Sequence, residues 1–282
     1  MNKIIDISNL EYHYNSQTKL LFDLNLQLES GSIHGLLGKN GEGKSTLLKL
    51  ISGLLFPING KMNILDYEPR KRNSKMLQDI FFLSEELPES NLSIRRFENV
   101  YAPFYSKYSS SKFYNNLNEL GIERKVKHIN EMSYGQRKKL MIAFGLATNA
   151  RLILMDEPTN GLDIPSKRQF RHLVASSIDK KSCIIISTHQ VLDLEDLINS
   201  IVIMDNHEIV LNETTENIAK KLIFKLADNS EIEENLIYSE DSLRGICQVI
   251  ENNTDQVGRV DIELLFNAVL AQKNKIKNLF SD

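Results

Sequence analysis

A phosphate-binding pattern between a strand and a helix constrains the fold of this chain more than any other feature. Residues 38–45 read GKNGEGKS and fit G-x-x-x-x-G-K-[ST]. The apolar run GSIHGLLG leads into them, and TLLKLISGLL follows with helical spacing until Pro57 and Gly60. Glycines let backbone N–H groups turn inward around phosphate oxygens, and the helix adds the positive end of its dipole. Lys44 is then placed to bridge the outer phosphates, and Ser45 to put its hydroxyl on Mg²⁺.

Two carboxylates follow a second aliphatic strand, in RLILMDEPTNGLD. Asp156 and Glu157 stand at its carboxyl end, where open α/β sheets bind ligands. Neighbouring strand residues point to opposite faces, but a turn of the backbone at the strand end can bring both carboxylates to one site. Asp156 suits the Mg²⁺ shell, and Glu157 can orient or deprotonate an attacking water. The alternative is an acidic turn punctuated by Pro158.

Two further polar segments have a structural and a functional interpretation. Thr188 and His189 end the strand in IIISTHQ, where a neutral imidazole could donate to the outermost phosphate. The segment MSYGQ precedes a helical run, so Ser133 could serve simply as the N-cap of that helix. The residues alone leave both alternatives open.

The order of patterns predicts an α/β fold. Residues 3–28 alternate apolar and polar side chains twice, which indicates two strands with the polar segment Asn15–Lys19 as a hairpin-like connection. A strand is expected around residues 79–84, and the region from about 87 to 150 is mostly helical in pattern. Nearly continuous aliphatic strands at 151–156, 182–187 and 200–205 are typical of a parallel sheet buried on both faces.

The pattern changes beyond about residue 219. Short alternating segments at 222–227, 235–239 and 245–253 precede one amphipathic helix over residues 260–276. We therefore expect a main domain over residues 1–218 and a small C-terminal α+β region over residues 219–282. No internal repeat or proline-rich linker marks the boundary.

Composition narrows the choice of partners. The chain has 282 residues, 41% of them hydrophobic, which is enough for a full core. A net charge of −3 supplies no general field for a nucleic-acid backbone, so no nucleic-acid partner is expected. Neither a secretory signal nor a run of about 20 apolar residues is found, so we expect a cytosolic location. Cys183 and Cys247 lie among aliphatic residues, as buried inert thiols do.

The motifs in this order resemble those of ATP-binding cassette (ABC) ATPases along residues 1 to about 215. GKNGEGKST resembles the P-loop of that family, LILMDEP its acidic strand, TNGLD its D-loop and STH its switch histidine. Between them, MSYGQ is similar to the LSGGQ signature. The resemblance implies a P-loop NTPase core of ABC-ATPase type with an antiparallel β subdomain and an inserted helical subdomain at about 87–150.

The resemblance also implies roles for individual residues. In this family two cassettes bind head to tail around two Mg-ATP, and the signature of one subunit caps the ATP on the P-loop of the other. The catalytic residues would be Glu157, His189 and Lys44. The nucleotide-binding residues would be Tyr14, Gly38, Asn40, Gly41, Gly43, Lys44, Ser45, Thr46, Ser133, Gly135, Gln136 and Asp163. The Mg²⁺ ligands would be Ser45, Asp156 and Glu85.

The chain departs from the family pattern at three positions. Met132 replaces the leading Leu of the signature, and Tyr134 replaces its first Gly; we expect the tyrosine ring to point away from phosphate. Glu85 stands where the family carries a Gln, and an extra carboxylate beside a triphosphate is electrostatically less favourable than an amide. For the aromatic residue that stacks on adenine, Tyr14 aligns best, although Tyr12 is close enough to compete.

The resemblance implies an ATP-hydrolysing subunit that works with a separate membrane permease at the inner face of the cell membrane. The single cassette with a C-terminal appendage looks most like bacterial export ATPases, an inference by analogy. The permease is expected to contact the region around residues 87–105. The alternatives are a soluble ABC ATPase that drives assembly of the iron–sulfur type, and a regulatory cassette that turns over slowly.

Overall fold

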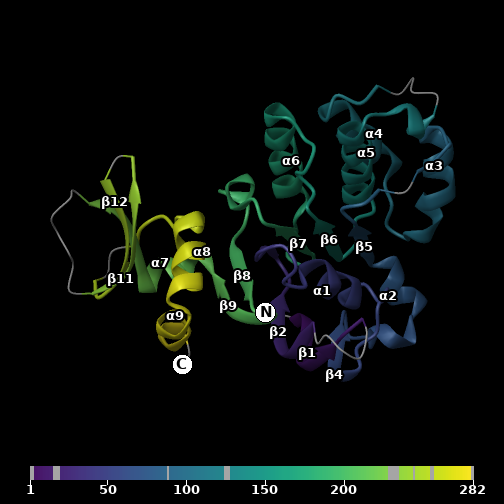
Figure 1. Ribbon diagram of the computed structural model, residues 1–282. Helices are drawn as coiled ribbons and strands as arrows, with labels where there is room; N and C mark the ends of the chain where they lie inside the picture. The colour runs from purple at the N-terminus through teal and green to yellow at the C-terminus, as the bar shows by residue number, and fades with distance from the viewer. Residues whose placement is uncertain are drawn as a thin grey trace.

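The computed structural model of the protein describes residues 3–14, 20–87, 89–123, 128–227, 235–243, 245–254 and 257–280. Within these ranges the chain forms a central six-stranded sheet, a three-stranded antiparallel sheet packed beside it, and a second three-stranded sheet near the C-terminus (Figure 1). The predicted connection Asn15–Lys19 lies outside the described residues. The α/β fold class predicted from the sequence is confirmed.

The six-stranded sheet has the order β5-β6-β7-β3-β8-β9. Its first five strands in this order are parallel, as their aliphatic sequences predict, and β9 runs antiparallel to β8. The sequence analysis missed β9, which follows β8 after the turn Asn206–His207, both residues with positive φ. The strands are β3 (Ser32–Leu37), β5 (Ile80–Leu83), β6 (Leu152–Asp156), β7 (Cys183–Thr188), β8 (Ser200–Asp205) and β9 (Glu208–Thr214).

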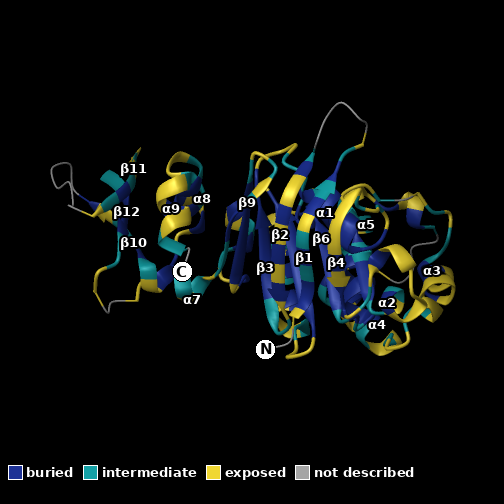
Figure 2. Ribbon diagram, turned by 90° about the horizontal axis from the view of Figure 1, so that it is seen from below, coloured by how far each residue is buried: buried dark blue, intermediate teal, exposed yellow. Residues whose placement is uncertain are grey.

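Two hydrophobic clusters sandwich this sheet, because successive residues of a buried strand point to opposite faces. Leu154 of β6 belongs to the cluster shared with helix α1 (Lys44–Ile51) and the antiparallel sheet, and Met155 belongs to the other cluster. The antiparallel sheet has the order β2-β1-β4, with β1 (Lys3–Tyr12), β2 (Leu21–Glu29) and β4 (Asn59–Ile64). Figure 2 shows the strands of the six-stranded sheet mostly buried, whereas β2 and β4 of the antiparallel sheet alternate buried and exposed residues.

The helices on the face of the six-stranded sheet opposite α1 come from the region 87–150, which was predicted to be helical, and from the segment after β6. A Cβ at Gly145 would collide with the ring of Phe81, so this glycine lets one helix lie closely on β5. These helices are α3 (Ile94–Tyr101), α4 (Ser110–Glu119), α5 (Tyr134–Ala147) and α6 (Ile164–Ser177). Shorter pieces are α2 (Ser74–Gln78), η1 (Pro69–Lys71), η2 (Ala102–Phe104), η3 (Ile129–Glu131) and η4 (Val191–Leu194).

The C-terminal region forms a small antiparallel sheet in the order β10-β12-β11, at the end of the molecule opposite α3 (Figure 1). The predicted single helix over 260–276 is wrong. The chain forms two helices, because Gln272 leaves the helical conformation at φ −127° and ψ 41° and the second helix turns to bury Ile276. The elements are α7 (Thr215–Lys221), β10 (Leu222–Ala227), β11 (Leu236–Ser242), β12 (Gly245–Glu251), α8 (Ile262–Ala271) and α9 (Lys273–Phe280).

The predicted division between residues 218 and 219 falls inside α7, and the division itself stays a prediction. Val249 of β12 and Leu265 of α8 belong to the same hydrophobic cluster as the strands of the central sheet, so apolar packing is continuous into the C-terminal region. Every helix in the described ranges is too short or too polar to cross a bilayer.

Candidate active site

The loop 38–45 lies between the end of β3 and the start of α1, as the sequence predicts. Gly41 and Gly43 have φ of 90° and 100°, a left-handed conformation that favours glycine. A Cβ at Gly38 would lie 2.9 Å from the backbone oxygen of Met204, so this strand end also needs glycine. Gly43 is the N-cap of α1 and offers no side-chain cap, which leaves N–H groups of the first turn for an anion.

Lys44 lies inside the curve of this loop and is only 6% exposed. Its ammonium donates to the backbone oxygens of Gly38 over 2.6 Å and of Lys39 over 3.0 Å. Burial lowers the pKa of Lys44, and the negative charges of Glu157 and Asp156 act in the opposite direction. The lysine of the loop and the two carboxylates of β6 are therefore electrostatic neighbours.

Asp156 ends β6 with its side chain 3% exposed. It pairs in register with Ser187 of β7, whose hydroxyl donates to one carboxylate oxygen. The hydroxyl of Ser45 and a carboxylate are hard oxygen ligands, the chemistry that Mg²⁺ selects. Within the described ranges no group of three or more His, Cys, Asp or Glu side chains could hold a metal ion. Ser45 and Asp156 offer the oxygen ligands that fit Mg²⁺, an ion that proteins usually bind through one or two carboxylates together with substrate phosphates.

Glu157 turns the chain immediately after β6, with φ of +45°. Glu157 is 5% exposed, and its carboxylate accepts three hydrogen bonds from Thr188, the last residue of β7, and His189, which follows it. The donors are the Thr188 hydroxyl at 3.0 Å, the His189 backbone N–H at 3.0 Å and His189 Nδ1 at 2.7 Å. The turn thus brings two adjacent acidic side chains against the same neighbouring strand, Asp156 onto Ser187 and Glu157 onto Thr188 and His189.

The signature segment caps its own helix in this structure. Ser133 is the N-cap of α5, and its hydroxyl accepts from the N–H of Gln136 at 3.2 Å while the Gln136 side chain accepts from the N–H of Ser133 at 2.9 Å. A Cβ at Gly135 would lie 2.6 Å from the backbone oxygen of Gly161, so the signature segment packs closely on the D-loop of the same chain. Ser133 and Gln136 are exposed. Ser133 does cap α5, and its role toward nucleotide stays a prediction.

The two unusual residues of the site contact each other. The hydroxyl of Tyr134 donates to the backbone oxygen of Glu85 over 2.8 Å, and its ring lies where a Cβ on Gly161 would approach within 2.7 Å. The Glu85 carboxylate accepts from the side chain of Asn160 at 3.2 Å. Lys138, a fully buried residue that the sequence analysis did not single out, also donates to the backbone oxygen of Glu85, at 3.1 Å.

The two competing tyrosines differ in accessibility. Tyr12 is 9% exposed and its ring belongs to the hydrophobic core. Tyr14 is 61% exposed, and its hydroxyl lies 3.0 Å from the hydroxyl of Thr46 in α1. The rings meet edge to face with their centres 5.1 Å apart. Of these two tyrosines, Tyr14 is the exposed one, and its hydroxyl contacts the helix that follows the phosphate-binding loop.

The remaining predicted residues lie at the edges of the site. Asn40 and Gly41 are exposed at the tip of the loop, and Ser45 is half-buried. Asp163 is the N-cap of α6 and accepts from the N–H of Ser166 at 2.9 Å. Hydrogen bonds from the side chain and then the backbone of Ser166 lower the pKa of its carboxyl. The structure therefore places Lys44 near the carboxylates of Asp156 and Glu157. The residues of the signature segment and Asp163 form hydrogen bonds with neighbours in their own segments.

Sequence reasoning missed four contacts around these residues. The Ser187 and Thr188 hydroxyls orient Asp156 and Glu157. This contact could have been predicted, because β7 and β6 are neighbouring parallel strands whose ends lie side by side. Lys138 carried no signal, since its burial depends on the packing of α5. Glu42 of the loop accepts from the backbone N–H of His207 at 2.9 Å, a contact made by the β8–β9 turn that the sequence did not predict.

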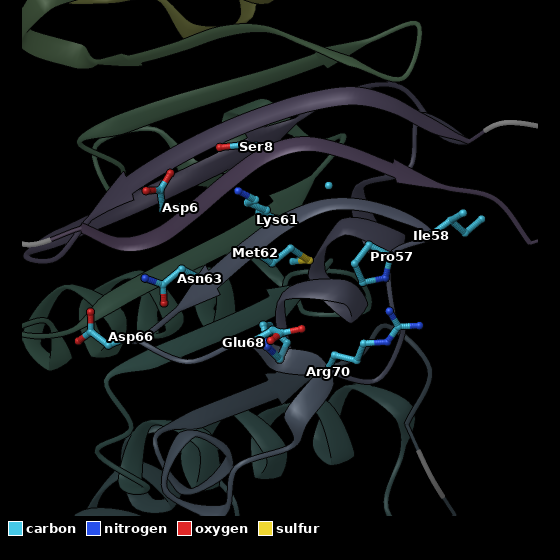
Figure 3. Close-up of a pocket in the computed structure, with 12 residues that line it drawn as sticks. Asp6, Ser8, Pro57, Ile58, Lys61, Met62, Asn63, Asp66, Glu68 and Arg70 are labelled. Atoms are coloured by element: carbon cyan, nitrogen blue, oxygen red, sulfur yellow. The ribbon is translucent and has the colours of Figure 1, made fainter.

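A separate open pocket of about 650 Å³ runs along β4 and is drawn in Figure 3. Asp6, Lys61, Asp66, Glu68 and Arg70 give it mixed charge. None of the predicted site residues lines it. The candidate site therefore lies at the carboxyl ends of β3, β6 and β7 and not in this pocket.

A glycine-rich loop holding a buried lysine, beside two carboxylates at the carboxyl end of a parallel strand, defines a P-loop nucleoside triphosphatase. The family model described as ABC transporter matches residues 21–160. The chain belongs to the family of ABC transporter ATP-binding subunits, and it binds and hydrolyses ATP. ATP-binding subunits of this family work with membrane permease components.

Three known proteins illustrate the similarity. The zinc uptake system ATP-binding protein ZurA of Listeria innocua is 30% identical over 215 residues, which cover 72% of this chain and 82% of that protein. The bacitracin transport ATP-binding protein BcrA of Bacillus licheniformis is 29% identical over 82% of this chain and 77% of its own length. The structure of cbiO1 from Clostridium perfringens, described as part of the ABC transporter complex cbiONQ, has a TM-score of 0.63 and 25% identity over 77% of this chain and 91% of that chain.

Proposed function

We propose that this chain is the ATP-hydrolysing subunit of a bacterial ABC exporter, bound to a separate membrane permease at the cytoplasmic face of the cell membrane. The catalytic part of this proposal rests on the orientation of Glu157, beside Lys44 and Asp156, by three donors from Thr188 and His189. A buried carboxylate aimed from a rigid sheet is suited to act on the attacking water.

The residues of the loop would hold the polyphosphate. The N–H groups from Gly38 to Thr46 surround the phosphate oxygens, and the Lys44 ammonium exchanges its two backbone acceptors for the outer phosphates. Ser45, Asp156 and Glu85 would hold Mg²⁺, which when bound neutralises phosphate charge. Tyr14 would stack its exposed ring on adenine, since the ring of Tyr12 is buried.

Glu157 would accept the proton of the water while its other contacts hold the carboxylate in place. The Thr188 hydroxyl and the His189 backbone N–H would fix the orientation of the carboxylate. A neutral imidazole carries one N–H, so His189, 37% exposed on its side chain, would turn this N–H from Glu157 to the outermost phosphate when nucleotide binds.

We further propose a head-to-tail homodimer. Ser133, Gln136 and Asp163 are exposed. The start of α5 has N–H groups that could donate hydrogen bonds to the phosphates of ATP bound on a second chain. Gly135 is half-buried beside them. In the dimer these residues would complete the ATP site of the other subunit.

The surface that receives the permease would be α3 and η2. Val100, Tyr101 and Phe104 are 49%, 41% and 64% exposed, and such adjacent apolar side chains on a surface are typical of an interaction site. Arg95 and Arg96 are exposed on the same helix. This surface lies within the region 87–105 expected from the sequence.

Export is supported by the longer similarity to BcrA. Its match covers 82% of this chain, so it must extend beyond α7 into β10, whereas the match to ZurA covers 72%. A match that reaches β10 in a bacitracin transport ATP-binding protein supports the export class. The competing function is a soluble ABC ATPase that acts in assembly, of the iron–sulfur type, or in regulation.

Co-purification tests the proposal. Tagged Glu157→Gln protein would be expressed in the native host, and its membranes solubilised in mild detergent with ATP and Mg²⁺. A multi-span membrane protein recovered in stoichiometric amount is the expected result, and its cavity would limit the choice of cargo. Recovery of soluble partners alone, with the tagged chain wholly cytosolic, would replace the transport proposal by the assembly function.

A further inference from the structure

The turn between β8 and β9 contacts the phosphate-binding loop at two points. The backbone N–H of His207 donates to the Glu42 carboxylate over 2.9 Å. The backbone oxygen of Met204 lies where a Cβ on Gly38 would approach within 2.9 Å. Asn206 and His207 both have positive φ, as a tight two-residue hairpin turn of type I′ requires. A turn 165 positions later in the chain therefore supports the loop.

Glu42 is an acidic side chain inside a loop that binds phosphate. A carboxylate directed at the phosphate oxygens would repel them. The hydrogen bond from His207 holds the carboxylate against the β8–β9 turn instead, with the Glu42 side chain 14% exposed. Gly41 and Gly43 flank Glu42, both with positive φ, and carry no side chain that could fix this part of the loop. The Glu42 carboxylate is therefore the tie between this part of the loop and the turn.

The hairpin brings two like charges together next to this turn. Asp205 and Glu208 lie directly opposite each other in the β8–β9 ladder, and like charges in such a pair destabilise it. Lys273 places its ammonium 3.7 Å from the Oδ2 atom of Asp205 and 3.5 Å from the Oε2 atom of Glu208. The side chains of Lys273 and Asp205 are 26% and 14% exposed, so solvent screens this pair only partly. Lys273 thus offsets two carboxylates that the hairpin holds together.

Apolar packing fixes the helix that carries this lysine. Lys273 is the first residue of α9, and Ile276 one turn later is fully buried. Ile276 belongs to the same hydrophobic cluster as Val210 and Leu211 of β9. Helix α9 contacts β9 along this side of the central sheet (Figure 1). The cation at the hairpin is therefore supplied by the C-terminal region.

We propose that Lys273 is a positioning residue through which the C-terminal region holds the phosphate-binding loop in the conformation that binds nucleotide. Lys273 stabilises the β8–β9 turn, and the turn holds Glu42 through the backbone N–H of His207. The inference rests on the proposed nucleotide site and gives the C-terminal region a role in nucleotide affinity. In this arrangement the side chains of Lys273 and Glu42 act on ATP only through the loop.

Five variants of the full-length chain test this connection. Glu42→Gln and Glu42→Met both remove the charge and keep the side-chain length, but only Gln keeps an amide oxygen for the N–H of His207. Lys273→Met removes the cation, and Lys273→Arg keeps it. Lys275→Met is the matched control, because the Lys275 ammonium on the same helix binds the backbone oxygen of Leu236 within the C-terminal region. The kcat and KM for Mg-ATP would be measured for each variant, with the thermal unfolding midpoint as the check that it is folded.

We expect the KM of Glu42→Met to be about tenfold above that of Glu42→Gln, the effect of one hydrogen bond. The KM of Lys273→Met should be about threefold above that of Lys275→Met, in line with one partly exposed ion pair. The effects on kcat should be smaller, because the loop binds nucleotide and does not act on the water. Lys273→Arg should match the wild type. Equal KM values within either compared pair would overturn the inference, as would a fall of the unfolding midpoint with no change in KM.

Amide hydrogen exchange without nucleotide separates this inference from the proposed function. The backbone N–H of His207, followed by NMR, should exchange about tenfold faster in Glu42→Met than in Glu42→Gln. It should also exchange faster in Lys273→Met than in Lys275→Met. A wild-type chain without ATPase activity would count against the proposed function, and these exchange rates would then decide the inference by themselves. Equal exchange rates within either pair overturn it. If Lys273→Met does not fold, Lys273→Gln takes its place with the same expected results.

Discussion

The Nδ1 atom of His189 lies 2.7 Å from the Oε1 atom of Glu157, and the backbone N–H of His189 donates to the same oxygen over 3.0 Å. Thr188 binds the second oxygen of that carboxylate. All three donors belong to the end of β7 and not to the strand that carries the glutamate. The orientation of Glu157 is therefore set by the pairing of two parallel strands before any nucleotide binds.

Replacing Glu157 by Gln should keep ATP binding and slow hydrolysis by about 10²- to 10⁴-fold, the range for loss of a positioned proton acceptor. The amide can keep its oxygen on the donors of His189 and turn its nitrogen toward the Thr188 hydroxyl, so the fold of the site survives. Steady-state ATPase assays and ATP titration measure the two effects. Lys44→Ala is the comparison, since it should weaken binding itself; normal turnover of Glu157→Gln would remove Glu157 from its catalytic role.

Replacing Ser187 by Ala should raise the Mg²⁺ concentration needed for half-maximal ATPase activity by about tenfold, because partners that orient a metal ligand tune its affinity. The Ser187 hydroxyl donates to Asp156, and its loss leaves that carboxylate free to rotate. ATPase activity would be measured against free Mg²⁺. Ser200→Ala is the control, because Ser200 is equally buried in β8 but bonds to the backbone of Glu213. Equal Mg²⁺ curves for both variants would contradict the role of Ser187.

Alanine substitutions should separate the two tyrosines near the loop. Tyr14→Ala should lower ATP affinity about tenfold, in line with the loss of one base–aromatic stacking contact, and leave the unfolding free energy nearly unchanged. Tyr12→Ala should instead lower the unfolding free energy by about 3 kcal/mol, since its ring is buried in the core. Nucleotide titration and urea unfolding of both variants give the comparison. The opposite pattern would assign adenine stacking to Tyr12.

His34 should make the fold sensitive to mild acid. It is 4% exposed in β3, and burial lowers its pKa from 6.5 to about 4 despite a contact to the backbone of Glu29. The unfolded chain binds this proton at higher pH than the folded chain, so stability is full above pH 6.5 and falls as the pH drops toward 4. The loss at pH 5 should be about 2 kcal/mol.

Urea unfolding of the wild type and of His34→Leu between pH 7.5 and pH 5 isolates this contribution, because carboxylates titrate equally in both proteins. The wild type should lose more stability than the variant by the stated amount. Parallel pH profiles for the two proteins would show that His34 is not the responsible group.

Phosphate binding by the loop could be predicted from the sequence, because the residues responsible are consecutive in the chain. The glycines with positive φ, the lysine in the curve and the helix that follows are all set within residues 38–45 and their neighbours. The acidic pair at the end of an aliphatic strand was likewise predictable, although the turn at Glu157 that brings both side chains to β7 was only an expectation. The prediction of one long C-terminal helix was wrong, because the break at Gln272 depends on which side chains pack into the core.

The amino-acid sequence by itself determined the fold class, the phosphate-binding loop and the family, because spacing along one chain encodes them. Only the tertiary structure decided which tyrosine is exposed, that Ser187 and Thr188 orient the acidic pair, and that Lys138 lies buried against Glu85. These contacts join residues far apart in the chain, and their existence depends on strand order and helix packing. Such contacts between distant residues follow from the packing of the whole core and not from any local sequence pattern.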